Sequence, residues 1–270
     1  MRHRIGGYSN MIQIFNENCF VTMDRFVTEN KKIDIILTSP PYNTGKTGTS
    51  QSGRDNYQNR YDVYDESLTD DEYIDWSLEL FKHYDSVLGE NGVILYNISY
   101  GVEHPDLLWD LLFKLIHNSV FMIADCIVWK KDSALPANQN PNKMTRITEF
   151  VFVICRRTEF ETFKSAKVPM GNNKYTCFSN FIQAKNNDGA NELNKATFST
   201  DFVEQLLIRY AKQGMIIYDS FMGTGTTAVA CKRIGLDCYG SELSPAQCKL
   251  ANEWLNGERF VKNKNVKKLF

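Results

Sequence analysis

Short apolar runs alternate along the chain with stretches in which apolar residues recur every three or four positions. The first pattern is typical of buried strands and the second of amphipathic helices, so the alternation predicts an α/β protein with a mostly parallel sheet. The expected strands cover residues 11–15, 33–39, 93–98, 121–130, 149–156, 215–221 and 237–243. The expected helices cover residues 19–29, 68–88, 104–118, 199–214, 226–235 and 244–258.

Local signals set some boundaries of these elements. Thr69 is expected to cap the second helix, because acids follow it directly and apolar side chains then repeat at helical spacing; the turn at 90–92 is expected to end that helix. Residues 121–130 and 149–156 are expected to form an antiparallel pair at one edge of the sheet. Residues 157–194 show little periodicity, so we expect a single domain, residues 1–270, that carries an irregular insertion.

The composition is that of an ordinary soluble globular protein, with 43% hydrophobic and 23% charged residues. The longest apolar runs are far below the roughly 18 residues that cross a bilayer, and no apolar core follows the charged N-terminus. We therefore expect no membrane segment, no secretory signal and a cytoplasmic location. The seven cysteines are scattered without a C-x-x-C pair or a nearby histidine cluster, so neither a metal site nor a disulfide framework is expected.

The charge distribution bears on nucleic acid binding. The net charge is −1, so such a partner would have to meet a local basic face. Residues 130–174 contain nine Lys or Arg against four acids. An ordinary solvated surface is the commoner explanation of such a run, and the count alone does not overturn it.

A glycine-rich turn, DSFMGTGTT, connects the sixth expected strand to the next helix. Gly223 and Gly225 allow positive φ and a close approach of the backbone to a ligand, and the helix start at Thr226 and Thr227 offers N–H groups to an anion. The lysine of a phosphate-binding loop is missing, and Ala228 stands where the dinucleotide pattern has its third glycine. The turn therefore favours a ligand without a pyrophosphate.

An acid at the end of the following strand adds to this pattern. Glu242 comes seventeen residues after Gly225 and is placed to accept hydrogen bonds from ribose hydroxyls. It could instead cap the helix that begins at Ser244. Glycine turn and acid together predict a nucleoside cofactor with a small carboxylate.

The second expected strand ends abruptly in the segment ILTSPPYN, residues 36–43. Two consecutive prolines fix φ and make a rigid corner, with an aromatic ring directly after it. The corner could serve only to reverse the chain, or it could be a shelf that holds a planar group.

These two segments resemble the motifs of DNA amino-methyltransferases. DSFMGTGTT resembles the F-x-G-x-G motif for S-adenosylmethionine, and LTSPPYN resembles the [D/N/S]-P-P-[Y/F] motif, which here comes first by about 180 residues, as in the permuted "beta" order. The resemblance implies a Rossmann-like methyltransferase fold: a doubly wound, circularly permuted, mostly parallel seven-stranded sheet. Residues 215–221 and 237–243 would then be its first two strands, and 11–15 and 33–39 its third and fourth.

The resemblance also implies catalytic roles in the proline corner. An exocyclic amine has its lone pair delocalised into the ring, so acceptors must bind both amine hydrogens and orient the nitrogen before it can attack. The Ser39 hydroxyl and the Pro40 carbonyl would be those acceptors, held rigid by Pro40 and Pro41. Tyr42 would stack on a base flipped out of the duplex.

Cofactor contacts follow from the same resemblance, and two of them have ordinary structural alternatives. Phe221 could be a core ring instead of a cofactor contact, and Asp219 could simply cap the turn. Asn18 and Cys19 lie in the segment NENCF, where the family usually has Asp-Cys, so Asn18 would approach the adenine without a charge. The expected S-adenosylmethionine contacts are Asp219, Phe221, Gly223, Gly225, Thr226 and Thr227 at the methionine part, Glu242 at the ribose, and Asn18 and Cys19 at the adenine.

Contacts with DNA are expected from two irregular regions. Residues 44–66 are polar and lack a core-forming pattern, so they are expected to be a loop that becomes ordered on DNA; residues 157–194 are the expected target-recognition insertion. The residues expected to contact DNA are Asn43, Lys46, Arg54, Lys130, Lys131 and Arg146.

Serine at the first motif position is associated in this family with N4 of cytosine and aspartate with N6 of adenine, so Ser39 favours cytosine over adenine. RNA or protein glutamine as substrate, and a non-catalytic DNA-binding relative, remain more distant alternatives; the motif order and the intact Ser39, Tyr42, Gly223 and Gly225 speak against the last two. DNA is the implied partner, with a cognate restriction endonuclease as a further candidate and a monomer or homodimer as the assembly.

Overall fold

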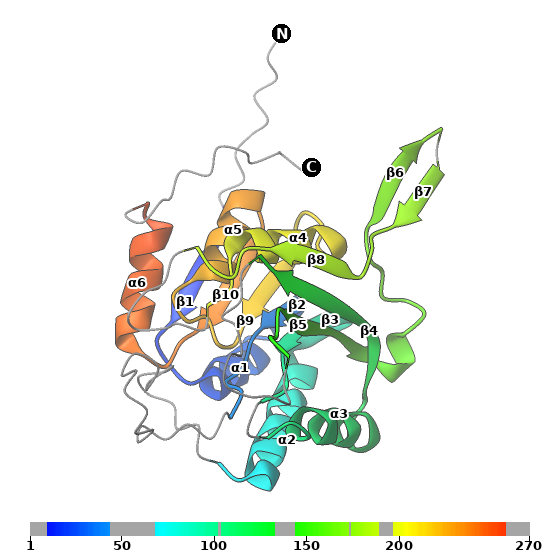
Figure 1. The fold of residues 1–270 in the computed structure, drawn as a ribbon. Coiled ribbons are helices and arrows are strands. Elements are labelled where there is room, and N and C mark those ends of the chain that lie inside the picture. Colours follow the sequence, from blue (N-terminus) through cyan, green and yellow to red (C-terminus); the bar gives the residue numbers. More distant parts are fainter. Residues whose placement is uncertain are drawn as a thin grey trace.

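The computed structural model describes residues 10–43, 68–101, 104–132, 144–172, 174–188 and 197–257. They form an eight-stranded sheet in the order β1-β10-β9-β2-β3-β5-β4-β8, with helices on both faces (Figure 1). The strands are β1 (Ile12–Phe15), β2 (Ile33–Thr38), β3 (Leu88–Ile98), β4 (Phe121–Lys131), β5 (Thr148–Arg156), β6 (Lys167–Gly171), β7 (Lys174–Cys177), β8 (Phe181–Ala184), β9 (Ile216–Asp219) and β10 (Asp237–Ser241). The helices are α1 (Cys19–Thr28), α2 (Asp70–Val87), α3 (Leu107–Asn118), α4 (Thr200–Tyr210), α5 (Thr226–Ile234) and α6 (Pro245–Leu255), with a 3₁₀ turn, η1, at Arg157–Glu159.

The sheet confirms the permuted order that the motifs predicted. β9 and β10, from the C-terminal part of the chain, lie between β1 and β2 from its N-terminal part, and these strands pair in parallel. β3 continues the parallel series, whereas β5 is antiparallel to both of its neighbours, β3 and β4. The carboxyl ends of β1, β10, β9 and β2 therefore meet at one edge of the sheet, although they come from opposite ends of the chain.

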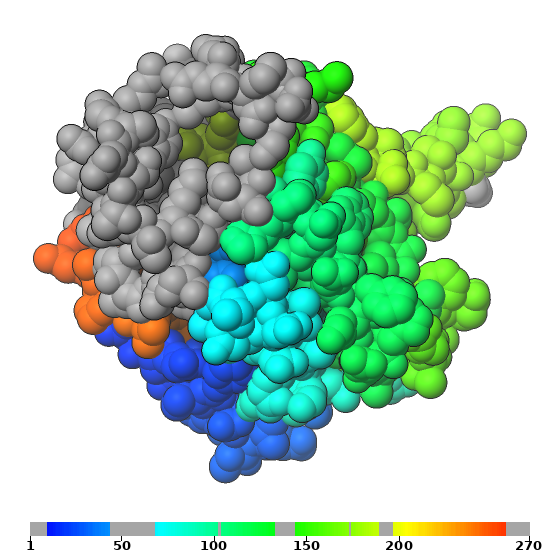
Figure 2. All heavy atoms as spheres, turned by 60° about the horizontal axis from the view of Figure 1, so that its bottom comes forward, coloured from blue at the N-terminus to red at the C-terminus, as the bar shows by residue number. Residues whose placement is uncertain are grey.

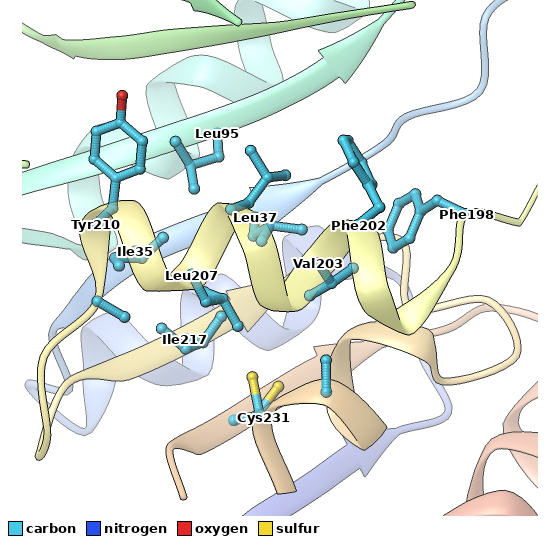
Figure 3. Close-up of a cluster of buried hydrophobic side chains, with 14 of the residues drawn as sticks. Ile35, Leu37, Leu95, Phe198, Phe202, Val203, Leu207, Tyr210, Ile217 and Cys231 are labelled. Atoms are coloured by element: carbon cyan, nitrogen blue, oxygen red, sulfur yellow. The ribbon is translucent and has the colours of Figure 1, made fainter. Parts of the chain in front are cut away.

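Each face of the sheet is covered by its own apolar cluster. Alternate residues of β2 point to opposite faces: Ile35 and Leu37 join the cluster under α4, α5 and α6, whereas Ile36 joins the one under α1, α2 and α3. Figure 3 shows Phe202 and Leu207 of α4 against this first cluster. Burial on both faces explains why the central strands are continuous apolar runs.

The helix α2 begins as predicted and ends earlier than predicted. The Thr69 side chain accepts from the backbone N–H of Glu72, and the Glu72 carboxylate accepts from the backbone N–H of Thr69, which completes a capping box. The helix ends at Val87, and β3 starts at once with Leu88 instead of after the turn at 90–92. A register shift between Leu88 and Val93 accommodates this turn inside the strand.

The sheet has eight strands rather than seven because β8 pairs in parallel with β4. The β4–β5 pair is antiparallel, as predicted, but β8 covers β4, so the pair does not form the edge. The sequence pattern missed β8 because only two of its four side chains, Ile182 and Ala184, are buried. β6 and β7 are almost fully exposed, and each is too short to give more than two alternating apolar residues.

The β6–β7 hairpin projects from the body of the protein (Figures 1 and 2). The hairpin comes after β5, and because β5 is antiparallel, its C-terminal end lies at the amino ends of the parallel strands. Two backbone hydrogen bonds place the intervening segment there as well: Arg157 donates to Val120, just before β4, and Ala166 donates to Arg209, near the end of α4. The first part of the expected insertion 157–194 therefore starts at the edge opposite the carboxyl ends of the central strands, and its role in target recognition stays a prediction.

Candidate functional site

A pocket lies at the carboxyl ends of the central strands. Its volume is about 970 Å³, which includes space open to solvent. Its walls come from the ends of β1, β2, β9 and β10 and the segments that follow them, together with the segment before α4 and one aromatic side chain of α2. These are the segments in which the sequence placed its candidate residues. The lining residues are Glu17, Asn18, Cys19, Phe20, Ser39, Pro41, Trp76, Thr197, Phe198, Ser220, Phe221, Met222, Gly223, Thr224, Thr226, Ser241, Glu242, Leu243 and Gln247.

The glycine turn after β9 lies against the wall of this pocket. Gly223 and Gly225 both have positive φ, 54° and 92°, which supports the sequence-based reason for glycine there. A Cβ on Gly225 would come within 2.7 Å of the Ala251 Cβ in α6, so the turn packs directly on that helix. A Cβ on Gly240 would likewise meet Met222, which brings β10 against the same turn.

The Glu242 carboxylate joins the glycine turn after β9 to the start of α6. Its Oε2 accepts from the backbone N–H of Gly223 at 2.7 Å, and its Oε1 accepts from that of Ser244 at 2.8 Å. The side chain is mostly buried and still lines the pocket. Both sequence-based interpretations of Glu242 therefore describe part of its surroundings: it faces the pocket, and it binds the N-cap residue of α6.

Asp219 lies beneath the glycine turn rather than in the pocket wall. Its carboxylate accepts from Thr38 Oγ1 at 2.9 Å, from Thr227 Oγ1 at 2.5 Å and from the backbone N–H of Phe221 at 3.1 Å. Burial raises the pKa of Asp219 from an ordinary 3.8 to about 6, although these hydrogen bonds lower it. Asp219 and Thr227 thus tie β2, the turn and α5 together from behind.

Asn18 and Cys19 lie at the pocket where β1 leads into α1. Asn18 is the N-cap of α1, and its side chain accepts from the backbone N–H of Phe20 at 3.0 Å. Cys19 is nearly buried, and burial raises the pKa of its thiol to about 12. The thiol is therefore neutral at physiological pH.

The proline corner faces the same pocket as the glycine turn. Ser39 and Pro41 line it, and the Pro41 carbonyl accepts from the hydroxyl of Tyr73, a buried residue of α2, at 2.7 Å. The Tyr42 hydroxyl lies 3.2 Å from Ser39 Oγ. Asn43 is buried with φ 49°, and its side chain donates to the backbone oxygen of Leu68 at 2.8 Å. α2 therefore braces the corner from below.

The residues expected to contact DNA are not gathered at one place, unlike the expected cofactor and catalytic residues. Lys46 and Arg54 lie outside the described residues, as does the whole segment 44–66. Lys130 and Lys131 end β4, and Lys131 forms an ion pair with Glu149. Arg146 packs over the ring of Tyr100, 4.8 Å from its centroid, and donates to the Tyr100 backbone oxygen. Their contacts with DNA stay predictions.

Sequence reasoning missed several pocket residues, and Trp76 is the most informative of them. Its ring lies 5.9 Å from that of Phe221, so the two aromatic side chains form one wall. Trp76 belongs to the apolar repeat of α2 and carries no motif of its own. Glu17 and Phe198 also line the pocket and were not among the expected contacts, although Glu17 lies in the segment NENCF that the resemblance placed at the adenine.

No group of three or more His, Cys, Asp or Glu within the described ranges is placed to hold a metal ion. Across those same ranges, no helix has the length and apolar character needed to cross a membrane.

A doubly wound sheet with a glycine turn after one central strand, and a pocket-lining acid after its neighbour, is typical of Rossmann-like proteins that bind a nucleoside cofactor. A family model described as DNA methylase, for N6 and N4 methyltransferases, matches residues 33–253. The chain therefore belongs to the N6/N4 DNA methylase family, as the two motifs predicted. Members of this family are S-adenosylmethionine-dependent DNA amino-methyltransferases, which confirms the expected cofactor class.

Curated relatives are type II methyltransferases. M.BglII of Bacillus subtilis is 23% identical over 251 residues, which cover 85% of this chain and 65% of that protein. M.Cfr9I of Citrobacter freundii is 29% identical over 166 residues, covering 58% and 53%. M.SmaI of Serratia marcescens is 23% identical over 266 residues, covering 83% and 85%. The chain thus spans less than two thirds of the length of the first two.

Solved structures share the fold. The PvuII DNA methyltransferase, described as cytosine-N4-specific, matches with a TM-score of 0.69 and 16% identity, covering 96% of this chain and 92% of that one. The M1.HpyAVI complex with S-adenosylmethionine matches with a TM-score of 0.60 and 22% identity, covering 91% and 100%. The predicted Rossmann-like methyltransferase fold is confirmed.

Proposed function

We propose that this protein transfers a methyl group from S-adenosylmethionine to an exocyclic amine of a flipped base in DNA, and that the amine is N4 of cytosine. The observation that carries the proposal is that the proline corner and the cofactor motif share one pocket: Ser39 and Pro41 line it together with Gly223 and Glu242. A methyl donor and an amine held at these two walls would be close neighbours.

The pocket has the features that S-adenosylmethionine needs. Glu242 supplies a carboxylate for the ribose hydroxyls, and the start of α5 at Thr226 supplies a backbone N–H group for the methionine carboxylate. Trp76 and Phe221 offer an apolar wall beside Asn18, so we assign Phe221 to the adenine instead of the methionine part. The bound cofactor supplies a methyl group activated by its sulfonium.

The proline corner supplies the acceptors for the amine. Ser39 Oγ and the Pro40 carbonyl accept the two amine hydrogens, which draws the nitrogen toward tetrahedral geometry and fixes its direction of attack. The Pro41 carbonyl already accepts from Tyr73, and this supports assigning the substrate contact to Pro40. Two prolines and the bond to Tyr73 keep the corner rigid.

Tyr42 holds the base while its hydroxyl is tethered. The hydroxyl contacts Ser39 and the strand β5 side chain Glu149, so the ring is fixed at one end and presents its face to a planar group. Flipping a base costs a few kcal/mol of unstacking, which stacking on an aromatic ring partly offsets. Serine rather than aspartate at position 39 supports cytosine as the target.

The type II names of the relatives support a role in restriction and modification in the cytoplasm, with a cognate endonuclease as the partner in the cell. DNA modified by this protein should then resist that endonuclease.

One labelling experiment tests the activity. The protein is incubated with labelled S-adenosylmethionine and unmethylated DNA or RNA, and the nucleosides are separated and identified by mass spectrometry. N4-methylcytosine from DNA is the expected product. N6-methyladenine alone would refute the cytosine assignment, label in RNA alone would refute the DNA assignment, and 5-methylcytosine alone or no label would refute amine methylation.

A pair of aromatic variants separates the base site from the cofactor site. Tyr42→Ala should abolish turnover and leave the Kd for S-adenosylmethionine unchanged in equilibrium dialysis. Phe113→Ala is the matched control, because Phe113 is 61% exposed on α3, outside the pocket lining, and should keep wild-type turnover. Equal loss of turnover and cofactor binding in Tyr42→Ala would contradict the assigned roles.

A further inference from the structure

The Tyr42 hydroxyl lies among several hydrogen-bonding atoms. Its oxygen is 3.2 Å from Ser39 Oγ and 3.3 Å from Glu149 Oε2. The backbone and side-chain oxygens of Asn97 are farther away, at 3.4 and 3.5 Å. A phenol has one proton and donates it to one acceptor at a time, and a carboxylate is a stronger acceptor than a hydroxyl or a neutral carbonyl. The Tyr42 proton therefore goes to Glu149.

Glu149 is held in the orientation that this bond requires. It lies on β5 opposite Trp129 of β4, and its Oε1 accepts from Lys131 Nζ. The Glu149 and Lys131 side chains are 17% and 24% exposed, so this ion pair is largely shielded from water. Lys131, which the sequence assigned to DNA, thus orients the other carboxylate oxygen toward Tyr42.

The direction of the first bond sets the direction of the next. Once Tyr42 donates to Glu149, the phenol oxygen can only accept, and the nearest donor is the Ser39 hydroxyl. The Ser39 proton then points at Tyr42, and the Ser39 lone pairs are left for another donor. If Tyr42 donated to Ser39 instead, the Ser39 proton would be able to turn toward the pocket and meet the hydrogens of the amine.

We infer that Glu149 is a positioning residue: through Tyr42 it fixes the Ser39 hydroxyl as a hydrogen-bond acceptor for the target amine. The inference rests on the proposed function, and it assigns roles to Glu149 and Lys131 that the two sequence motifs do not contain. The contacts of the Tyr42 hydroxyl with Ser39 and Glu149 are long in this structure, and catalytic hydrogen bonds of this kind shorten when substrate binds.

Glu149→Gln tests this inference. The amide is nearly isosteric, but its NH₂ group can donate to Tyr42 and reverse the chain of hydrogen bonds. Its kcat for DNA methylation should fall about 10- to 100-fold, the effect of losing a hydrogen bond to a charged group, while the KM for DNA and the Kd for S-adenosylmethionine stay at wild-type values. Tyr42→Phe keeps the stacking ring and breaks the same chain, so it should lose kcat to the same extent.

The double variant and a control complete the test. Glu149→Gln combined with Tyr42→Phe should be no slower than either single variant, because both act through one chain. Glu204→Gln is the matched control, since the Glu204 side chain is 18% exposed and paired with Arg233, and neither residue lines the pocket; its kcat should be that of the wild type.

The outcomes separate this inference from the proposed function. A wild type that labels DNA and a Glu149→Gln variant with unchanged kcat would overturn the inference alone. Multiplying losses in the double variant, or an equal loss in Glu204→Gln, would also overturn it. A wild type that labels no DNA amine would refute the proposed function and this inference with it.

Discussion

Replacing Gly225 with alanine would test how closely the glycine turn packs on α6. Gly225 has φ 92°, and a Cβ there would lie 2.7 Å from the Ala251 Cβ and 3.0 Å from its Cα. These are atoms of a helix, so they can move away only if the helix shifts. Left-handed φ costs a non-glycine residue about 1–2 kcal/mol, and overpacking costs about 1–3 kcal/mol, so Gly225→Ala should lose about 2–5 kcal/mol of unfolding free energy.

Gly214 provides the control that separates the two costs. It has nearly the same φ, 87°, but a Cβ there would have nothing within 4 Å. Gly214→Ala should therefore lose only the conformational part, about 1–2 kcal/mol. Urea unfolding of both variants, followed by circular dichroism, measures the difference, and S-adenosylmethionine binding should weaken only in Gly225→Ala. Equal losses of stability in the two variants would refute the close packing of turn and helix.

Two further variants test the groups that hold the pocket in place. Tyr73→Phe leaves the Pro41 carbonyl without its donor, so it should lose about 1–3 kcal/mol of stability and should lower kcat without changing the Kd for S-adenosylmethionine; an unchanged kcat would contradict the bracing role of Tyr73. Asp219 has its pKa raised to about 6 by burial, so between pH 3.8 and about 6 the folded protein holds a proton that the unfolded chain has released. Its contribution to stability is therefore largest below pH 3.8 and falls as the pH rises to about 6. The stability of the wild type relative to Asp219→Asn, measured by urea unfolding from pH 4 to 7, should decline over that window, and a flat difference would contradict the shift.

The glycine turn shows how far sequence reasoning reaches into the site. The strand–glycine–helix order, the positive φ of Gly223 and Gly225 and the place of Glu242 at the next strand end could all be predicted, because each depends on a few neighbouring residues. The direction in which the Asp219 side chain points could not be predicted from the sequence. Its carboxylate turns away from the pocket because Thr38 and Thr227 offer hydroxyl donors behind the turn.

The secondary structure shows the same division. The cap at Thr69 and the antiparallel pairing of β4 with β5 were predicted correctly from local signals and apolar runs. β8 was missed, because a four-residue edge strand with one exposed face has little hydrophobic pattern. The place of the β6–β7 hairpin at the amino edge was also invisible, since it depends on the direction of β5 in the finished sheet.

The sequence by itself determined the fold class, the permuted order of the central strands, the family and the two motifs that meet at the pocket. The fold class follows from local periodicity, whereas the permuted order and the family follow from the resemblance of two short motifs to those of known methyltransferases. Only the tertiary structure brought Tyr73 to the Pro41 carbonyl, Trp76 to Phe221, and Glu149 with Lys131 to the Tyr42 hydroxyl. Such contacts join residues that are far apart in the chain, and a side chain finds its partner there only after both faces of the sheet are packed.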